Sequence, residues 1–383
     1  MLPLIEGLAA RGLPVTVFTD RRFAEAVNRS GATFRDLFAS ISLEAADDRS
    51  LPVPCRYVTF AERHLDNFIA QITEMKTRLV VYDTFAVIAP LASRELGLPH
   101  VNLCSGHNVE PNRFGEMLKV DSRVDLADSC LEAVTNLQRR FPDLEISPFC
   151  FVSLLSPDLN LYCEPGAFLP ARERKPFEPL AFFGSLPAES ALTRPTKARI
   201  LEKTGSRILH IYASFGTVIW RYYRRDALRA LGTLAKAFER QPEIRLLIST
   251  GGDTLAVREL AMDGVEVESY VDQPTVLDEV DLFVTHHGLN STHEAIVRQV
   301  PMISYPCFWD QPALAQRCQE LDLAVPLGRE MRQPITESDV LEALDLARAR
   351  GRELRAGLAK AARWEVEVIT ARHRVFDRIE ALL

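Results

Sequence analysis

The stretch that decides the fold spans residues 281–327 and reads DLFVTHHGLNSTHEAIVRQVPMISYPCFWDQPALAQRCQELDLAVPL. It begins with an apolar, β-branched run, DLFVT (281–285), which predicts a buried strand. A turn that contains Gly288 follows, and a segment of helical period begins at Asn290. The next apolar run, PMIS (301–304), predicts a second strand. A strand, a helix and a strand in this order are typical of a βαβ unit in a parallel sheet.

The turn between this strand and the helix has the features of an anion site. Gly288 lets the backbone approach a ligand closely, and the N–H groups at the start of a helix attract a phosphate. His286 can donate a hydrogen bond to the same phosphate, and Glu294, one turn into the helix, can accept one from a ribose hydroxyl. Asn290 and Ser291 have an alternative role as a helix cap, because Glu294 stands near capping-box spacing from Ser291.

Two polar residues follow the second strand of this unit. Asp310 and Gln311 come after PMISYP, and their side chains are suited to bind the hydroxyl groups of a sugar. Asp310 has an alternative role as the N-cap of the helix that begins there.

The rest of the chain repeats the alternation of short apolar runs with longer segments of helical period. In the first half, strands are expected at 14–18, 32–37, 78–82, 100–103, 158–163 and 180–184. The clearest helices of that half are expected at 60–76 and 85–97. In the second half, strands are expected at 207–213, 244–248, 265–269, 281–285 and 301–304, with helices that begin near Asp226, Asp253, Asn290 and Asp310. This pattern predicts an α/β fold with parallel sheets that helices cover on both faces.

A boundary between two domains is expected in GSLPAESALTRPTKARILEKTGSR (184–207), which has two prolines, small polar residues and clustered charges. The predicted organisation is an N-terminal domain over 1–185, a linker over 186–206 and a C-terminal domain over 207–363. The amphipathic segment 364–383 is expected to form a helix that packs across both domains, back onto the N-terminal one, or against a partner chain.

Composition excludes several classes of protein. The 383 residues are 47% hydrophobic and 25% charged, which is near the average for globular proteins and unlike a disordered or collagenous chain. A net charge of −7 argues against a nucleic-acid partner. No apolar run is long enough for a membrane span, and the start of the chain has no secretory signal. The seven cysteines include no CxxC pair, so we expect reduced thiols in a cytoplasmic protein.

The run THHGLNSTHEA, with VP and DQ after it, closely resembles the donor-binding signature of family 1 nucleotide-sugar glycosyltransferases. That family includes plant secondary-product enzymes and bacterial antibiotic, macrolide and carotenoid transferases. The match covers about 45 contiguous residues. Weaker similarity, including YASFGT (212–217) and the opening LPLIEGLAARGLPVTVFT, covers most of the chain. The resemblance implies the GT-B architecture, in which two Rossmann-like, doubly wound domains face each other across a cleft. It assigns the acceptor to the N-terminal domain and the nucleotide sugar to the C-terminal domain.

The resemblance also implies roles for individual residues of the donor site. At the diphosphate it places His286, Gly288, Asn290, Ser291, Ser214 and Thr217. At the ribose it places Glu294, and at the base it places the backbone near Val271 in SYVDQPTVL (269–277). At the sugar it places Asp310 and Gln311.

Three positions of the donor signature have no assigned role. Leu289 replaces a tryptophan of the plant enzymes, so the choice between UDP and dTDP stays open. His287 and His293 match no functional position of the family, and we interpret them as surface or packing histidines.

In the N-terminal half, the resemblance makes Asp83 the aspartate that orients a base histidine, with capping of a helix at Phe85 as the alternative. In the family that histidine follows a first strand, whereas the printed sequence begins at Met1, inside the next helix. Loss of that strand would leave two hydrophobic strand edges without a partner. A start assigned too late and a segment left out of the printed sequence are favoured over a natural truncation. In a truncated protein His107, in SGHNVEPNR (105–113), is the candidate replacement base, although it also fits a structural loop histidine.

A metal ion is not expected in this chemistry. No DxD motif follows a strand where Mg²⁺ would bridge the diphosphate, and the N-terminus of a helix with His286 can stabilise the leaving group instead. The sequence therefore predicts a hexosyltransferase without a cofactor, which inverts the sugar and moves it from a UDP- or dTDP-sugar to a hydroxyl of a small hydrophobic, natural-product-like acceptor. The alternatives are a nucleotide-sugar epimerase of the same fold and a non-catalytic nucleotide-sugar-binding or auxiliary protein.

Overall fold

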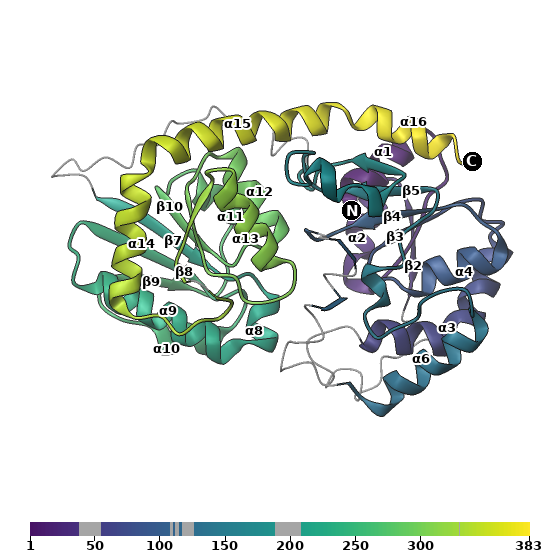
Figure 1. Ribbon diagram of the computed structural model, residues 1–383, viewed down its shortest axis with the longest axis horizontal. Coiled ribbons are helices and arrows are strands. Elements are labelled where there is room, and N and C mark those ends of the chain that lie inside the picture. Colours follow the sequence, from purple (N-terminus) through teal and green to yellow (C-terminus); the bar gives the residue numbers. More distant parts are fainter. Residues whose placement is uncertain (38–54, 108–109, 112–114, 117–125, 188–207, 329) are drawn as a thin grey trace. The chain divides into compact units, whose positions relative to one another are not determined.

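The computed structural model describes the chain except residues 38–54, 108–109, 112–114, 117–125, 188–207 and 329. It contains two compact units, which Figure 1 shows in the colours of the sequence. Unit 1 comprises Met1–Pro187 and Thr370–Leu383, and unit 2 comprises Ala188–Ile369. Nearly all of the linker predicted at 186–206 lies outside the described residues. All named strand pairs in both units are parallel, so the predicted α/β class is confirmed.

Unit 2 contains one parallel sheet in the order β12-β11-β10-β7-β8-β9. Its strands are β7 (Leu209–Ser214), β8 (Ile244–Ser249), β9 (Val265–Glu268), β10 (Leu282–Thr285), β11 (Met302–Ser304) and β12 (Ala324–Pro326). In chain order this is 3-2-1-4-5-6 read from β9, which is the order of a doubly wound sheet. The order reverses between β7 and β10, which are neighbours in the sheet. The sequence pattern predicted every strand of this sheet except β12.

Helices pack on both faces of the unit 2 sheet (Figure 1). One group, which has mutual contacts, is α9 (Arg224–Glu239), α10 (Thr254–Leu260) and α14 (Glu337–Ala349). The other group is α11 (Gln273–Leu277), α12 (Leu289–Val297) and α13 (Gln311–Glu320). The short α8 (Val218–Tyr222) precedes α9, and α15 (Gly351–Thr370) follows α14.

A single hydrophobic core holds the unit 2 sheet and its helices together. Strand residues such as Ile211, Leu282 and Ile303 pack with Leu231 and Leu234 of α9. The apolar residues of the chain are thus spread over short strands and amphipathic helices. Among the described residues, no helix has the length and the hydropathy to cross a lipid bilayer.

Unit 1 contains two parallel sheets. The first pairs β1 (Thr16–Thr19) with β2 (Thr33–Asp36). The second has the order β3-β4-β5-β6, with β3 (Val80–Asp83), β4 (His100–Cys104), β5 (Leu159–Tyr162) and β6 (Leu180–Phe182). In a doubly wound sheet one strand would lie between β1 and β3, and no strand among the described residues does so.

The helices of unit 1 differ in length and position along the chain. They are α1 (Leu2–Ala10), α2 (Ala24–Arg29), α3 (Cys55–Glu74), α4 (Ile88–Leu96), α6 (Asp128–Arg140) and α16 (Arg372–Glu380). Single 3₁₀ turns are formed by Arg21–Phe23, Cys150–Val152, Ala171–Glu173 and Lys175–Phe177. The two helices that the sequence predicts at 60–76 and 85–97 correspond to α3 and α4.

The C-terminal segment forms two helices, α15 and α16, with a turn at Ala371 between them. The helix α16 packs within unit 1. Arg372 donates hydrogen bonds to the carbonyl oxygens of Phe183, at 2.8 Å, and Leu186, at 2.6 Å. Its guanidinium also lies over the Phe183 ring. The last residues of the chain are therefore tied to unit 1 by buried, charge-assisted hydrogen bonds.

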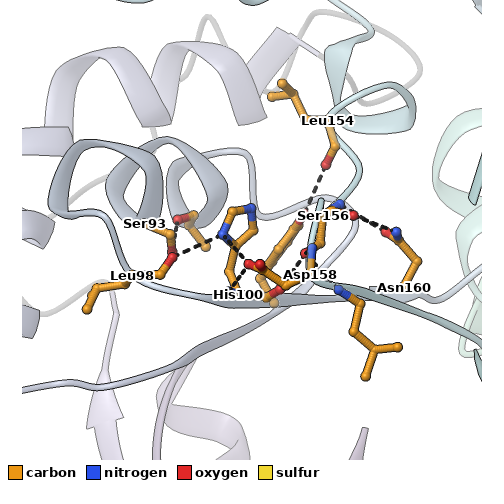
Figure 2. Close-up of polar contacts among 10 residues, drawn as sticks. Ser93, Leu98, His100, Leu154, Ser156, Asp158 and Asn160 are labelled. Atoms are coloured by element: carbon orange, nitrogen blue, oxygen red, sulfur yellow. Dashed lines mark hydrogen bonds and ion pairs between the residues drawn. The ribbon is translucent and has the colours of Figure 1, made fainter. Parts of the chain in front are cut away.

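A polar cluster joins the amino ends of β4 and β5 (Figure 2). The backbone N–H of His100 donates to the Asp158 carboxylate at 2.9 Å, and His100 Nδ1 lies 3.2 Å from the carbonyl oxygen of Leu98. The Asn160 side chain accepts from Ser156 N and donates to Ser156 O. Ligands of doubly wound sheets bind outside the carboxyl ends of the strands. This cluster therefore stabilises the sheet at the edge that does not bind ligands.

We predict opposite effects on stability for two helical glycines of unit 2. A Cβ at Gly357, in α15, would lie 2.7 Å from the carbonyl oxygen of Leu321 and closer still to that of Asp322. Because backbone cannot yield easily, Gly357→Ala should lower the free energy of unfolding by about 1–3 kcal/mol. A Cβ at Gly232, in α9, would meet only Leu260, at 3.8 Å. Gly232→Ala should raise the free energy by about 0.5–1 kcal/mol, because alanine favours a helix.

Urea denaturation of the two variants beside the parent protein measures both changes. A stabilising Gly357→Ala would show that α15 does not pack against the carbonyl oxygens at the end of α13.

Candidate functional site

The donor residues predicted from the sequence lie at the carboxyl edge of the unit 2 sheet. Ser214 ends β7 and pairs in register with Thr285, which ends β10, so the sheet order reverses at these two residues. His286 follows Thr285 directly, and its side chain lies near the backbone of Ser214. Ligands of doubly wound sheets bind at such a reversal point. The fold therefore brings Ser214 and His286 together at the place where a ligand is expected.

The imidazole of His286 packs tightly between two glycines. A Cβ added to Gly216 would lie 2.9 Å from His286 Nε2, and one added to Gly288 would lie 2.7 Å from the same atom. Gly216 also has a φ of +67°, a conformation that side chains disfavour. Both glycines are therefore required by the position of the ring. The sequence singled out Gly288 and missed Gly216.

Burial controls the charge of His286. The residue is 7% exposed, and burial lowers the pKa of its imidazole to about 4. The ring is therefore neutral near pH 7. Its Nδ1 has no hydrogen-bond partner among the described residues. A neutral imidazole in this position can donate a hydrogen bond to an oxyanion, and the negative charge of the oxyanion would then favour protonation of the ring.

Helix α12 begins directly after this turn, with Gly288 at the N-cap. No side chain caps the helix, so the interpretation of Ser291 and Glu294 as a capping box is wrong. Their side chains contact α11 instead: Gln273 Nε2 donates to Ser291 Oγ at 3.1 Å and to Glu294 Oε2 at 2.7 Å. The first backbone N–H groups of α12 therefore have no side-chain cap, which suits an anion.

The sequence analysis missed Gln273. This residue begins α11, directly after the loop of Val271, and its side chain links that loop to the predicted diphosphate and ribose positions. Burial raises the pKa of Glu294, and the bond from Gln273 opposes this rise. Tyr270, beside Val271, is 73% exposed. No local pattern in the sequence indicates that the Gln273 side chain contacts α12, which begins sixteen residues later.

Two predicted diphosphate residues are more exposed than the others. Thr217 stands at the N-cap of α8 and is exposed, and its side chain makes no capping hydrogen bond. Asn290 is exposed in the first turn of α12. Thr217 follows β7 and Gly216, which packs against the His286 ring, and Asn290 follows the turn after β10, so both border the same edge of the sheet.

The predicted sugar residues lie between β11 and α13. Asp310 is at the N-cap of α13, but its side chain makes no capping hydrogen bond, so the capping alternative is wrong for this residue. Gln311 Oε1 accepts hydrogen bonds from the backbone of Cys307, at 3.0 Å, and Phe308, at 3.1 Å. The side-chain oxygen of Gln311 therefore accepts hydrogen bonds within the loop, and its side-chain NH₂ group can donate to a ligand.

Two bulky residues of these turns have left-handed backbone. His287 has a φ of +61°, and Trp309 has a φ of +67°. Such conformations cost free energy in residues other than glycine and are often found at binding sites. The buried ring of His287 is held by Thr292 Oγ1, at 3.2 Å, and by Ser304 Oγ, at 2.7 Å. His287 thus keeps the turn after β10 fixed to β11.

The sequence analysis interprets two histidines without an assigned role as surface or packing residues, and the surface interpretation is wrong for both. His287 and His293 are fully buried, so they are packing residues. His293 Nδ1 lies 2.5 Å from Glu365 Oε1, and Glu365 is also fully buried. This pair joins α12 to α15, and it explains how a charged residue is tolerated inside the C-terminal helix.

In unit 1, Asp83 and His107 lie at the carboxyl edge of the second sheet. Asp83 ends β3, and its Oδ1 accepts from the backbone of Phe85 at 3.0 Å. Helix α4 begins at Ile88, so Asp83 caps a turn and not a helix that starts at Phe85. Burial raises the pKa of Asp83 despite this bond. His107 follows β4 and is buried. Across the described residues, no cluster of three or more histidine, cysteine or acidic side chains is arranged to hold a metal ion.

We predict that His286 makes stability pH-dependent. Its folded pKa lies below the usual value of 6.5, so the unfolded chain takes up the proton first as the pH falls. The parent protein should therefore lose about 2–3 kcal/mol more than His286→Asn between pH 7 and pH 4.5. Urea denaturation at both pH values measures the difference, and equal losses in the two proteins would contradict a buried, neutral imidazole.

Comparisons with known proteins show similarity to glycosyltransferases. The family model described as UDP-glucoronosyl and UDP-glucosyl transferase matches residues 175–347. The chain is 24% identical over 352 residues to the NDP-glycosyltransferase YjiC of Bacillus subtilis (strain 168), which covers 90% of this chain and 84% of that protein.

Two solved structures share the fold of the whole chain. The glycotransferase of kitacinnamycin superposes with a TM-score of 0.72 at 22% identity, over 100% of this chain and 94% of the other. The glycosyltransferase VinC, solved in complex with dTDP, superposes with a TM-score of 0.64 at 17% identity, over 100% and 96%. The chain is therefore an enzyme, a glycosyltransferase with the GT-B fold, and it is similar to the family 1 nucleotide-sugar-dependent transferases.

Proposed function

We propose that this enzyme moves a sugar from a UDP- or dTDP-sugar to a hydroxyl group of a small hydrophobic, natural-product-like acceptor, with inversion and without a metal ion. One observation carries the proposal. The neutral imidazole of His286 and the uncapped N-terminus of α12 meet where the order of the unit 2 sheet reverses. A nucleoside diphosphate is the leaving group whose charge this arrangement stabilises best.

The residues around His286 suit the other parts of a nucleotide sugar. Glu294, with a raised pKa and a bond to Gln273, can exchange that bond for one from a ribose hydroxyl. The exposed ring of Tyr270, beside Val271, offers a face on which a base can stack. The complex of VinC with dTDP supports a thymidine nucleotide, and the family description supports a uridine nucleotide.

Inversion requires that the acceptor oxygen attacks the anomeric carbon from the side opposite to the diphosphate, while a base takes the acceptor proton. Asp83 supports such a step from unit 1, because a carboxylate there favours the protonated form of a nearby base. The relative named for kitacinnamycin supports a natural-product-like acceptor.

Incubation with UDP-glucose or dTDP-glucose and a panel of hydroxyflavones and macrolides tests this function directly. We expect an acceptor to gain the mass of one hexose, the new bond to be β from an α-linked donor, and EDTA to leave the rate unchanged. An isomerised nucleotide sugar without a glycosylated acceptor would indicate an epimerase. Nucleotide binding without either product would indicate an auxiliary protein.

We predict that the loop between β11 and α13 separates binding of the sugar from binding of the nucleotide. Gln311→Glu keeps the oxygen that accepts from Cys307 and Phe308 but removes the amide donor. Asp310→Asn removes the charge and keeps the shape. Both variants should bind the intact nucleotide sugar about 10-fold more weakly, the cost of one hydrogen bond of about 1.4 kcal/mol, and should bind free UDP or dTDP as the parent does.

Titration calorimetry with free nucleotide and with nucleotide sugar measures the two affinities. Glu294→Gln is the matched control, because the ribose is common to both ligands, and it should weaken both. Equal losses for both ligands in Gln311→Glu would show that the loop had changed shape.

We predict that Asp83→Asn slows transfer without weakening the donor. The amide still accepts from the backbone of Phe85, so the turn is kept, but the charge that favours a protonated base is lost. Turnover should fall about 10²–10⁴-fold. The fall should be larger for alcohol acceptors than for phenols, which lose a proton at pKa about 10. Steady-state rates with one alcohol and one phenol measure this difference. If Asp83→Asn turned over the alcohol as fast as the parent enzyme, Asp83 would only cap a turn.

A further inference from the structure

The turn between β8 and α10 reads STGGD (249–253) and lies at the carboxyl edge of the unit 2 sheet. Ser249, the last residue of β8, pairs in register with Ser214, the last residue of β7. Ligands of doubly wound sheets bind outside this edge. The turn after β8 is therefore a neighbour of the donor residues, although the resemblance to glycosyltransferases assigned it no role.

Gly251, in the middle of this turn, is enclosed on two sides. A Cβ at Gly251 would overlap the carbonyl oxygen of Gly216 and would lie 2.8 Å from Trp220 Cδ1. Gly251 also has a φ of +59°, a conformation that side chains disfavour. Trp220 is buried in the hydrophobic core of unit 2, where close packing keeps it from moving away. A side chain at position 251 would therefore displace the backbone of Gly216.

A displacement of Gly216 would reach His286, because the backbone of Gly216 packs directly on the imidazole. The ring is neutral because its neighbours exclude water: burial lowers its pKa to about 4, and a hydrogen bond with the backbone of Ser214 opposes this change. Gly251, Gly216 and His286 thus form a row of contacts across the turns after β8, β7 and β10. The turn after β8 therefore determines how closely the turn after β7 covers the imidazole.

The turn after β8 is itself held in place by β9 and the residue that follows it. The backbone N–H of Thr250 donates to the carbonyl oxygen of Glu268 at 2.9 Å, and that of Gly252 donates to the carbonyl oxygen of Ser269 at 2.7 Å. The Thr250 hydroxyl is fully buried and donates to the carbonyl oxygen of Asp253 at 2.7 Å. Ser269 begins the loop expected at the base, so this turn joins that loop to the diphosphate residues.

We propose that Gly251 is a positioning residue for the binding of the nucleoside diphosphate. Because it has no side chain, the turn after β8 can hold the carbonyl group of Gly216 in place. Gly216 in turn covers the His286 imidazole and keeps it where it can donate a hydrogen bond to the diphosphate. Gly251 acts through the diphosphate site, so its replacement weakens the free nucleotide as well as the nucleotide sugar. This inference rests on the donor site of the proposed function.

Titration calorimetry of the full chain with UDP and with dTDP tests this role. In Gly251→Ala the Kd of the nucleotide that binds the parent should rise about 10–100-fold, the cost of a hydrogen bond to a charged group. Gly264→Ala is the matched control, because Gly264 precedes β9 at the opposite edge of the sheet and has a φ of +77°. A Cβ at Gly264 would have no other described atom within 4 Å. The control carries similar backbone strain and should bind the nucleotide as the parent does.

A double-mutant cycle separates positioning from a general loss of stability. In the background of His286→Asn, Gly251→Ala should raise the Kd by a smaller factor than in the parent, because the group through which it acts is gone. The same factor in both backgrounds would overturn the proposal. Thr250→Val is a milder variant, which keeps the shape but removes the hydroxyl that fixes the turn. If Gly251→Ala does not fold, Thr250→Val should show a smaller loss with the same dependence on His286, and a loss without it would overturn the proposal.

A spectroscopic measurement separates this inference from the proposed function. In ligand-free protein labelled with ¹⁵N-histidine, the His286 signal is the one that is missing from His286→Asn. Displacement of Gly216 admits water to the ring, so the pKa of His286 should rise from about 4 toward its usual value of 6.5 in Gly251→Ala and stay in place in Gly264→Ala. The parental titration in Gly251→Ala would overturn the proposal. If neither nucleotide bound the parent, the proposed function would be wrong, and the titration would still decide whether Gly251 positions His286.

Discussion

The donor site depends on one constraint, the reversal of strand order between the neighbouring parallel strands β7 and β10. Because all strands of the unit 2 sheet are parallel, every connection that leaves a carboxyl end emerges at the same edge. Where the order reverses, the connections from β7 and β10 turn to opposite faces of the sheet and leave space between them. Residues far apart in sequence, such as Ser214 and His286, meet at that point.

The turns at this edge are built at a local cost in free energy. The ring of His286 fits only because Gly216 and Gly288 have no side chain, and the same close packing removes water from the ring and keeps it neutral. His287 and Trp309 hold left-handed backbone that their side chains disfavour. The hydrophobic core of unit 2 offsets these costs, because its closely packed side chains hold the strands in place.

Unit 1 shows that position in the fold, more than residue type, decides what a polar pair does. His100 with Asp158 and His107 with Glu164 join the same two strands, and the second pair is buried, whereas the Asp158 side chain is 31% exposed. The first pair belongs to a network with Ser156 and Asn160 that holds the amino ends of the strands. The second lies at the edge to which Asp83 also belongs.

The sequence by itself determined the parallel α/β class and the strands from β7 to β11, because hydrophobic periodicity and turn residues are local properties. It also placed His286 directly after a strand, Glu294 in the helix that follows, and Asp310 and Gln311 at the start of the next helix. The brief β12 was missed because three residues carry too little pattern. Only the tertiary structure decided which side chains meet: Gln273 with Glu294, His293 with Glu365 and His107 with Glu164. These partners lie on different elements, 21, 72 and 57 residues apart, and packing of whole helices and strands brings them together, so no local pattern in the sequence encodes the contact.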